Sequence, residues 1–328
     1  MAKMAKKDFL TIAQLTREDV RWILSRAAGY ASGEGAPSGG GILSGRGIGL
    51  IFEKSSTRTR VSFAMAIWQL GGFPLFLSSE DIQITRGETI ADTARVLSGY
   101  LEGLVIRTFE QERLNAWAAH AEIPVLNGLT DLHHPCQALA DLFTIEQIRK
   151  GLSGLKLAYI GDGNNVAHSL IESGAKMGME VVLACPKEFE PDPDIVAAAQ
   201  QEARRSGAVI RVVRDPEEAA EKADVLYTDV WVSMGKEKES SARRKTFAPY
   251  QINRRLLSRA RPDALVMHCL PAHRGEEITA DVMDSPQSVI FDQAKSRLPV
   301  QKAILEWVMR GDLSPARAGG SKGSRKGR

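Results

Sequence analysis

Short apolar runs of strand length alternate with longer helical patterns along most of the chain. The predicted strands of the first half cover residues 47–52, 74–77, 104–108 and 124–127. Those of the second half cover residues 155–160, 180–184, 209–213, 225–228, 265–268 and 288–291. Strands that are separated by helices pair in parallel through right-handed crossovers, which place helices on both faces of the sheet. The alternation therefore predicts an α/β fold with two doubly wound parallel sheets.

The two predicted sheets imply two domains, and 328 residues give each domain an ordinary size. A long predicted helix ends near residue 149, and Ser153-Gly154 after it predicts the joint between the sheets. We therefore expect a first domain over residues 1–150 and a second over residues 151–297. A last helix over 298–311, with Pro299 in its first turn, is expected to complete the first domain.

The stretch Gly311–Arg328 has five basic residues and one Asp, a net charge of +4. Subtracting it from the total of +3 leaves the rest of the chain near −1. A tail rich in Gly, Ser, Lys and Arg cannot bury a core, so we expect residues 312–328 to be disordered. A contact between this tail and a polyanion stays open, but the chain as a whole does not predict nucleic acid as a partner.

Several classes of protein are excluded by pattern. No run of about 18 apolar residues occurs, so the sequence predicts no membrane span. The opening MAKMAKKDFL is basic without an apolar stretch, so we expect no secretory signal. Cys136, Cys185 and Cys269 are an odd number and widely spaced, which favours a reducing, cytoplasmic location over a disulfide framework. Because no CxxC pair occurs, we expect no structural zinc site.

Ligands of open α/β sheets bind outside the carboxyl ends of the strands. The first predicted strand ends in a group of hydroxyl and cationic donors: Lys54, Ser55, Ser56, Thr57, Arg58 and Arg60. At a helix N-terminus such donors suit a phosphate dianion. The motif GxxxxGK[ST] is missing, so this is not a nucleotide P-loop. The alternative is an ordinary capped helix with surface arginines.

Two further strand ends of the first half are polar. Arg107 follows an apolar run, and HHPCQ places His134 at a helix cap and Gln137 in the first turn, where both can point at a carbonyl group. His134 could instead be a cap satisfied by the backbone. A Cys136–His134 nucleophile–base pair is disfavoured because sequence neighbours at a helix start diverge. Gln83, in the polar loop SSEDIQITRGET, could belong to a lid, to a neighbouring subunit or to a solvated loop.

Three predicted strands of the second half are followed by amide, carboxylate or thiol side chains rather than by arginines. LAYIGDGNN lacks the third glycine of a dinucleotide site, but its asparagines can hold a carboxylate. Asp229 directly follows a strand and could pair with an ammonium group, and the SMG and KEKESSARRK segments after it look mobile enough to close over a ligand. Cys269 precedes Leu270-Pro271, a rigid turn that could contain a cis peptide. A capping Asp and a structural thiol are the alternatives.

The motifs SSTRTR, HPCQ, DGNN, DVWVSMG and HCLPAHRGEEIT, in this order, resemble the aspartate/ornithine carbamoyltransferase family, with SMG and HCLP typical of its ornithine branch. The resemblance covers about Phe9 to Arg310. It implies a carbamoyl-phosphate domain, an ornithine domain and an active site in the cleft between them. It further implies carbamoyl transfer from carbamoyl phosphate to the δ-amine of L-ornithine, giving L-citrulline and phosphate, in arginine metabolism. No cofactor or metal is implied, and the assembly is a homotrimer or a multiple of trimers, with active sites between subunits.

Carried over by motif, the residues that bind the phosphate are Ser56, Thr57, Arg58 and Thr59, with Gln83 from a loop near the subunit boundary. The carbamoyl end is held by Arg107, His134 and Gln137. Ornithine is bound by Asn165, Asp229, Ser233 and Met234. The remaining positions, on the carbamoyl-phosphate side, are Cys269, Leu270 and Arg297. The resemblance gives direct catalytic roles to Arg58, Arg107, His134, Asp229 and Cys269.

Alternatives remain open from the sequence. The acceptor could be another amine, such as putrescine or an acylated ornithine, because pocket shape is not visible in a sequence. A catalytically silent oligomer with a polyanion-binding tail is an alternative of another class, although the intact set of arginines and histidine argues against it. The sequence leaves the anabolic or catabolic direction open.

Overall fold

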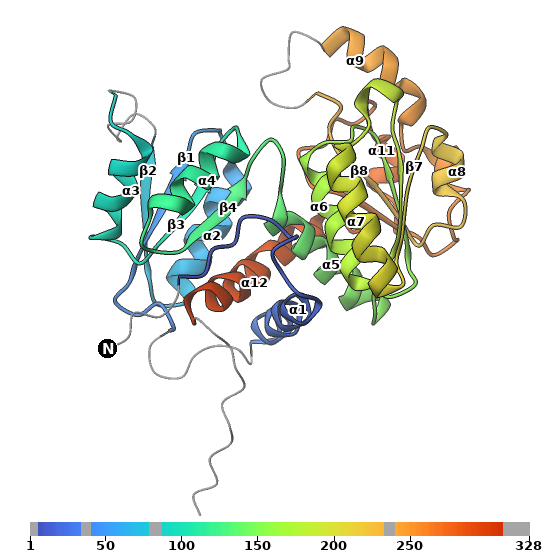
Figure 1. Ribbon diagram of the computed structural model, residues 1–328. Helices are drawn as coiled ribbons and strands as arrows, with labels where there is room; N and C mark the ends of the chain where they lie inside the picture. The colour runs from blue at the N-terminus through green and yellow to red at the C-terminus, as the bar shows by residue number, and fades with distance from the viewer. Residues whose placement is uncertain (1–5, 34–40, 79–86, 233–239, 311–328) are drawn as a thin grey trace, which may run out of the picture.

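The computed structural model describes residues 6–33, 41–78, 87–232 and 240–310, and it has two lobes, each built around one parallel sheet (Figure 1). The first sheet has the order β2-β1-β3-β4, with β1 (Gly47–Phe52), β2 (Phe73–Ser78), β3 (Gly103–Arg107) and β4 (Val125–Leu129). The second has the order β7-β6-β5-β8-β9, with β5 (Lys156–Ile160), β6 (Glu180–Ala184), β7 (Val209–Val213), β8 (Val225–Thr228) and β9 (Leu265–His268). All the pairings between these strands are parallel, as the sequence predicted.

Helices cover both faces of each sheet. In the first half they are α1 (Arg17–Ser32), α2 (Thr57–Gln69), α3 (Ile90–Ser98), α4 (Gln111–His120) and α5 (Pro135–Arg149). In the second half they are α6 (Asn165–Met177), α7 (Pro193–Ser206), α8 (Pro216–Ala220), α9 (Ser240–Phe247), α10 (Arg254–Leu257), α11 (Ala280–Met283) and α12 (Ile290–Met309), with the 3-10 turns η2 (Lys187–Phe189) and η4 (Ala248–Tyr250).

Alternate residues of a strand bury their side chains in different cores, as the period of two requires. In β1, Leu50 belongs to an apolar cluster with residues of α1, α2, α5 and α12, whereas Ile51 belongs to a cluster with residues of α3 and α4. In β5, Tyr159 faces α6 and α7, and Ile160 faces α8 and α10. The predicted fold class, two doubly wound parallel sheets, is confirmed.

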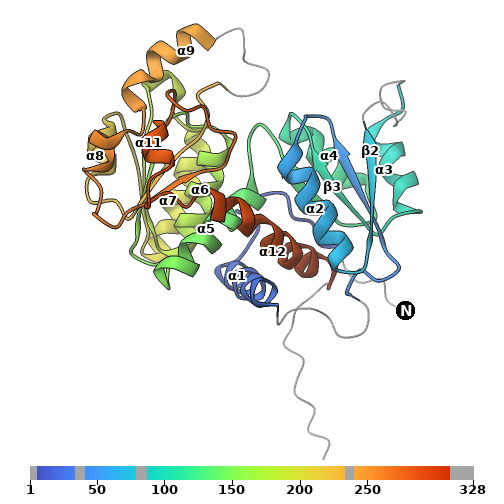
Figure 2. The ribbon, with the colours of Figure 1, turned by 180° about the vertical axis from the view of Figure 1, so that it is seen from behind.

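Two helices join the sheets into one body. The first eleven residues of α5, Pro135–Ile145, are buried, and α12 packs against α1, α2 and α5. Figure 2 shows α12 leaving the second lobe and running beneath the first. One apolar cluster extends from Leu126 of β4 through Leu139 and Ile304 to Met267 of β9. The relative position of the two sheet edges is therefore fixed by a shared hydrophobic core rather than by a linker alone.

The structure corrects the last part of the predicted chain. The predicted strand over 288–291 is wrong: Ser288 makes an isolated bridge to Val266, and α12 begins at Ile290. Pro299 therefore lies inside α12 instead of in its first turn, and the predicted boundary after residue 297 falls within this helix. The β-branched pair Val289-Ile290 resembles a strand, but Ile290 packs in the second core cluster from the first residue of a helix, so tertiary packing overrides propensity.

A buried acidic group ties α12 to α1. Oε2 of Glu306, a fully buried residue, accepts hydrogen bonds from Nε of Arg26 at 2.6 Å and from the Tyr30 hydroxyl at 2.6 Å. Burial raises the pKa of Tyr30, and Glu306 acts in the same direction, so the hydroxyl stays a donor. These bonds hold the two helices in register from opposite ends of the sequence.

We expect Glu306→Leu to lower the free energy of unfolding by about 1–3 kcal/mol, because Arg26, Tyr30 and Arg310 lose their acceptor, while the two arginines keep some solvent contact. Urea denaturation at fixed protein concentration measures the change. The control Glu202→Leu, on the outer helix α7, should change it by less than about 0.5 kcal/mol. Equal losses in the two variants would contradict the role of Glu306 as a link between the helices.

Candidate active site

The predicted site residues that the structure describes lie around the switch points of both sheets. In the first sheet β1 lies between β2 and β3, and in the second β5 lies between β6 and β8. In each sheet the chain first adds strands on one side of the central strand, β1 or β5, and then crosses over to add strands on the other side. The carboxyl end of such a central strand is the usual position of a ligand in this type of fold. Arg107 is the last residue of β3, and the segments that follow β1, β5 and β8 contain Arg58, Asn165 and Asp229.

Three arginines from three different elements form the centre of the site. We call Arg58 of α2, Arg107 of β3 and Arg297 of α12 the arginine cluster. Burial lowers the pKa of Arg107 to about 10, and the charges of Arg297 and Arg58 act in the same direction. Burial also lowers the pKa of Arg297. The Nε atoms of all three are buried, and none has a hydrogen-bond partner among the described residues. Such a group is incomplete without an anion.

The start of α2 is open rather than capped. Ser56 occupies the N-cap position, but its side chain makes no capping hydrogen bond, and the first turn has no acidic residue. Thr57 is exposed, and Thr59 is buried and accepts a hydrogen bond from Nη2 of Arg297 at 2.6 Å. The hydroxyls and backbone N–H groups of this turn therefore remain available to an anion, which argues against an ordinary capped helix.

Two cations of the same segment lie outside the arginine cluster. The Arg60 guanidinium stacks over Phe76 at 4.3 Å, and Lys54 pairs with Asp131. Sequence reasoning grouped both with Arg58, because spacing alone does not show which way neighbouring side chains point at a strand–helix turn.

His134 and Gln137 begin α5 and are both buried. Burial lowers the pKa of His134 well below its usual value, and the three arginines act in the same direction, so the imidazole is neutral at pH 7. Its Nδ1 is buried, as is Oε1 of Gln137, and neither has a hydrogen-bond partner among the described residues. The backbone N–H of His134 donates to Ser169 at 2.9 Å, so the second half also fixes this turn.

Cys136 is not an activated nucleophile. It is fully buried, its Sγ donates to the carbonyl of Asn127 at 3.3 Å, and burial raises its pKa to about 12. The thiol packs between α5 and β4, and no pairing with His134 is observed among the described contacts.

In the second half, Asp229 accepts two hydrogen bonds: from Nδ2 of Asn164 at 2.8 Å and from Sγ of Cys269 at 3.0 Å. Burial and the Asp229 charge raise the pKa of Cys269 well above its usual value, so Cys269 is a neutral thiol donor. Asn165 instead donates to the carbonyl of Thr130 at 2.7 Å. Sequence reasoning chose Asn165 and missed the contact of Asn164, whose side chain both caps α6 and holds Asp229.

The turn after β9 brings the two halves into contact. The Leu270–Pro271 peptide is cis, as predicted, and the carbonyl of Leu270 accepts a hydrogen bond from Nη2 of Arg58 at 2.6 Å. The N–H of Leu270 donates to Nδ1 of His268 at 2.8 Å, and Nε2 of His268 lies 3.2 Å from Oε1 of Glu277. His268 and Glu277 therefore hold the backbone of this turn by hydrogen bonds. Both residues belong to the motif HCLPAHRGEEIT, but the sequence did not predict this role.

Some predictions fall outside the described residues: Gln83, Ser233 and Met234, and the tail over 312–328. Beyond residue 239 the charged segment forms α9. There Arg243 is buried, stacks over Phe189 at 4.4 Å and pairs with Asp162. This part of the segment is therefore anchored to the second half rather than free in solution.

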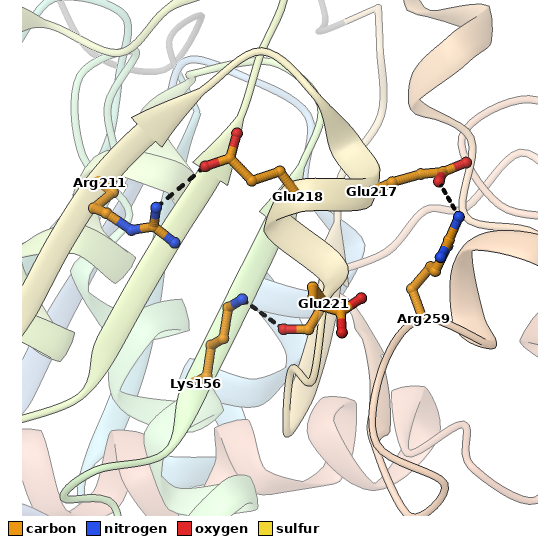
Figure 3. A pocket seen from close by; sticks show the side chains of 6 residues that line it. All are labelled: Lys156, Arg211, Glu217, Glu218, Glu221 and Arg259. Atoms are coloured by element: carbon orange, nitrogen blue, oxygen red, sulfur yellow. Dashed lines mark hydrogen bonds and ion pairs between the residues drawn. The ribbon is translucent and has the colours of Figure 1, made fainter.

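A charged pocket lies beside α8 in the second half (Figure 3). It is lined by Lys156, Arg211, Glu217, Glu218, Glu221 and Arg259. Arg211 pairs with Glu218 at 3.2 Å, Arg259 with Glu217 at 2.5 Å, and Lys156 donates to the carbonyl of Glu221 at 2.6 Å. Lys156 is the first residue of β5, so the pocket lies near the amino ends of the strands, away from the candidate site.

Two groups of described residues bring three potential metal ligands within 4.8 Å of one another: Asp229, His268 and Cys269, and His273, Glu276 and Glu277. In the first group the Cys269 thiol donates to Asp229, and Nδ1 of His268 accepts from Leu270. Hydrogen bonds therefore account for this arrangement. Within the described residues, no helix has the length and apolar character required to cross a membrane.

Comparison with known proteins places this geometry in a family. A profile described as aspartate/ornithine carbamoyltransferase, carbamoyl-P binding domain, matches residues 7–147, and one described as the Asp/Orn binding domain matches residues 153–308. The ornithine carbamoyltransferase of Oceanobacillus iheyensis is 53% identical over 306 residues, which are 92% of this chain and 94% of that protein. A Pyrococcus furiosus protein named ornithine carbamoyltransferase, anabolic, is 48% identical over 311 residues, 95% of this chain and 99% of that protein.

The solved structure of ornithine carbamoyltransferase from Pyrococcus furiosus matches with a TM-score of 0.90 at 48% identity, covering 94% of this chain and 98% of that one. The two profiles together, and each of the matches to relatives, extend over nearly the whole chain. The chain therefore belongs to the aspartate/ornithine carbamoyltransferase family.

Proposed function

We propose that this enzyme transfers the carbamoyl group of carbamoyl phosphate to the δ-amine of L-ornithine, giving L-citrulline and phosphate. The observation that carries the proposal is a set of buried polar atoms that have no hydrogen-bond partner among the described residues: Nε of each residue in the arginine cluster, Nδ1 of His134 and Oε1 of Gln137. Together they match an acyl phosphate with an amide end, since the cationic groups suit the phosphate and the others a carbamoyl group.

Carbamoyl phosphate binds first to the first half. Its phosphate occupies the N-terminus of α2, held by Ser56, Thr57, Thr59 and the arginine cluster. Its carbonyl oxygen lies against Arg58, Arg107 and His134, and its amino group against Gln137. The Leu270 carbonyl, which already bonds Arg58, aligns that guanidinium from the second half. Gln83, which lies outside the described residues, stays a predicted further contact.

The amino acid binds to the second half. Asp229 holds its ammonium group, with Asn164 and Cys269 fixing the carboxylate of Asp229. Asn165 and, outside the described residues, Ser233 and Met234 remain predicted contacts of the α-carboxylate and α-amino groups. The neutral δ-amine attacks the carbonyl carbon, so an N–C bond forms, and the C–O bond to phosphate breaks as the nitrogen loses a proton. The cationic donors stabilise the oxyanion that develops in between.

Two observations support a cytoplasmic location and a biosynthetic direction of the reaction. The three cysteines are free, as expected for a cytoplasmic enzyme. The name of the Pyrococcus furiosus relative supports the anabolic direction, toward arginine.

We assign residues 1–150 with the C-terminal helix to the carbamoyl-phosphate domain and residues 151–297 to the ornithine domain. Because α12 begins at Ile290, its first turns belong to the junction rather than to either domain alone.

Exposed apolar side chains support assembly into a trimer. Val61, Met65 and Trp68 form a stripe along α2, and Phe73 and Phe76 are exposed on the edge strand β2. The Arg60–Phe76 contact shows that the two elements adjoin. An apolar edge of this kind marks an interface between chains, and it adjoins the arginine segment of α2, as expected for active sites between subunits.

Arg58→Ala should lower kcat/KM for carbamoyl phosphate by about 10²–10³, because one guanidinium serves both the phosphate and the oxyanion. Citrulline formation from ornithine and carbamoyl phosphate is the assay, with putrescine and N-acetylornithine as rival acceptors. The control Arg205→Ala, on the exposed face of α7, should stay within about twofold of the unsubstituted enzyme. Failure of that enzyme to make citrulline would overturn the proposed function.

The pH dependence follows from the amine and from the two depressed pKa values. The δ-amine has a pKa near 10.4, like lysine, so kcat/KM for ornithine should rise about tenfold per unit from pH 7 to 9. His134 is neutral throughout this range, because its pKa is lowered, and adds no break near pH 6.5. Loss of the Arg107 proton, with a pKa of about 10, should lower the rate above pH 10. A flat profile between pH 7 and 9 would contradict attack by the free amine.

Trp68→Glu should yield fewer subunits per particle, measured by light scattering after gel filtration, because it buries a charge in the proposed interface. Phe291→Glu, an exposed apolar position at the start of α12, serves as the control and should leave the mass unchanged. The proposed interface would be wrong if Trp68→Glu retained the mass of the unsubstituted protein.

A further inference from the structure

A buried carboxylate lies one helical turn after Gln137. Of the residues predicted to bind substrate, it forms a hydrogen bond only with Gln137. Asp141 is fully buried on α5. Its Oδ1 accepts hydrogen bonds from Nε2 of Gln137 at 2.8 Å and from Nε2 of Gln293 at 2.7 Å, and its Oδ2 accepts from the Tyr227 hydroxyl at 3.0 Å. All three contacts are donors, so this position requires an acceptor and not merely a polar side chain.

These contacts set the orientation of the Gln137 amide. The backbone N–H of His268 orients Gln293, whose Nε2 donates to Oδ1 of Asp141, so Oδ1 is an acceptor and the NH2 side of the Gln137 amide faces it. The carbonyl side is left as a buried acceptor, and within the described residues Oε1 of Gln137 has no hydrogen-bond partner. His134 and Gln137 share the first turn of α5, so this acceptor lies at the turn that contributes to the candidate site. An acceptor there recognises an N–H group.

The orientation depends on both halves of the chain. Gln293 belongs to α12, and its Oε1 accepts the backbone N–H of His268 in β9 at 2.9 Å. Its Nε2 also lies 3.0 Å from the Tyr227 hydroxyl of β8. The network therefore extends from Gln137 to the residue before Cys269, and it holds the amide only when the two lobes are packed as observed.

Stability does not explain a carboxylate at this position. Burial raises the pKa of Asp141 to about 7, against its hydrogen bonds and the charge of Arg297. A buried acid without an ion-pair partner costs free energy that an apolar residue of the same shape would not. A residue retained at such a cost is expected to serve the site instead.

We propose that Asp141 is a positioning residue: by holding Nε2 of Gln137, it presents Oε1 to the amino group of the donor and makes the site select a carbamoyl phosphate over an acyl phosphate. The inference rests on the proposed function, because it specifies how the same donor is recognised. Acetyl phosphate has a methyl group in place of this amino group, and it would leave Oε1 unpaired and desolvated.

Two stable phosphonates isolate this contact. Phosphonoacetamide has a methylene in place of the bridging oxygen of carbamoyl phosphate, and acetonylphosphonate differs from it only by a methyl group in place of the amino group. We expect calorimetric titration of the unsubstituted enzyme to show a preference of about 10- to 100-fold for phosphonoacetamide. Asp141→Leu should reduce this preference to about threefold or less, mainly by weakening phosphonoacetamide, because the released amide can turn its NH2 side to the ligand.

A double-mutant cycle separates positioning from general damage. In the Gln137→Ala background, adding Asp141→Leu should change the Kd of phosphonoacetamide by no more than about twofold, because Asp141 acts through Gln137. Asp141→Asn, which keeps one acceptor oxygen, should retain most of the preference. The matched control is Thr144→Val, one turn further along α5, where a buried hydroxyl likewise bonds α12 through Ser296 at 2.9 Å. Thr144→Val should retain the full preference.

If Asp141→Leu does not fold, the double variant Asp141→Leu, Tyr227→Phe removes the acceptor and one of its donors together, and it keeps Gln293 as the acceptor of the His268 backbone N–H. A folded Asp141→Leu or double variant that keeps the preference, or equal and additive losses in the cycle, would overturn the role of Asp141. That result would leave the proposed function intact if the unsubstituted enzyme makes citrulline. Failure of the citrulline assay itself would overturn the proposed function first.

Discussion

Repulsion among three neighbouring guanidinium groups, two of them on buried residues, is the constraint on which the rest of the structure depends. Burial lowers the pKa of Arg107, Arg297 and His134, the charge of Arg58 acts in the same direction on all three, and no carboxylate among the described residues forms an ion pair with the three arginines. Each also has a buried Nε that makes no hydrogen bond within the described part of the chain. A protein interior tolerates such a group only where the surrounding packing is strong and where a ligand supplies the missing charge. Burial, together with this repulsion, keeps His134 neutral and therefore able to act as a hydrogen-bonding group rather than as a competing cation.

The packing that holds these groups together comes from the junction of the two sheets. The three arginines belong to α2, β3 and α12, so they come together only when these three elements pack against one another. The apolar core around α5 and α12 extends into both lobes, and Glu306 fixes α12 to α1 at its far end. Contacts from the second half, such as the Leu270 carbonyl on Arg58 and Ser169 on the backbone of His134, then align the donors of the first half. The cleft is thus held by ordinary hydrophobic burial, while its lining carries uncompensated charge.

The sequence predicted the positions of the site but only part of its contacts. Strand ends are visible as apolar runs that stop at polar residues, which is why Arg107, His134, Asp229 and Cys269 could be found. It did not distinguish Asn164 from Asn165, because adjacent side chains at a helix start point in different directions. Asp141 has a local signal, four residues after Gln137 on one helix face, but its partners Tyr227 and Gln293 are 86 and 152 residues away. The start of α12 was wrongly predicted as a strand, because β-branched residues such as Val289 and Ile290 favour strands locally. The packing of Ile290 in the second core cluster, which the sequence pattern does not show, favours the helix.

The central claim is that the arginine cluster and the Asp229 group are the two ends of one binding site. A crystal structure with N-(phosphonoacetyl)-L-ornithine, a molecule that joins both substrates, tests it most directly. The account predicts phosphonate oxygens at about 2.7–2.9 Å from guanidinium nitrogens of the arginine cluster, with the amide at His134 and Gln137 and the amino-acid end at Asp229. A well-ordered ligand bound elsewhere, with the arginine cluster unoccupied, would contradict it.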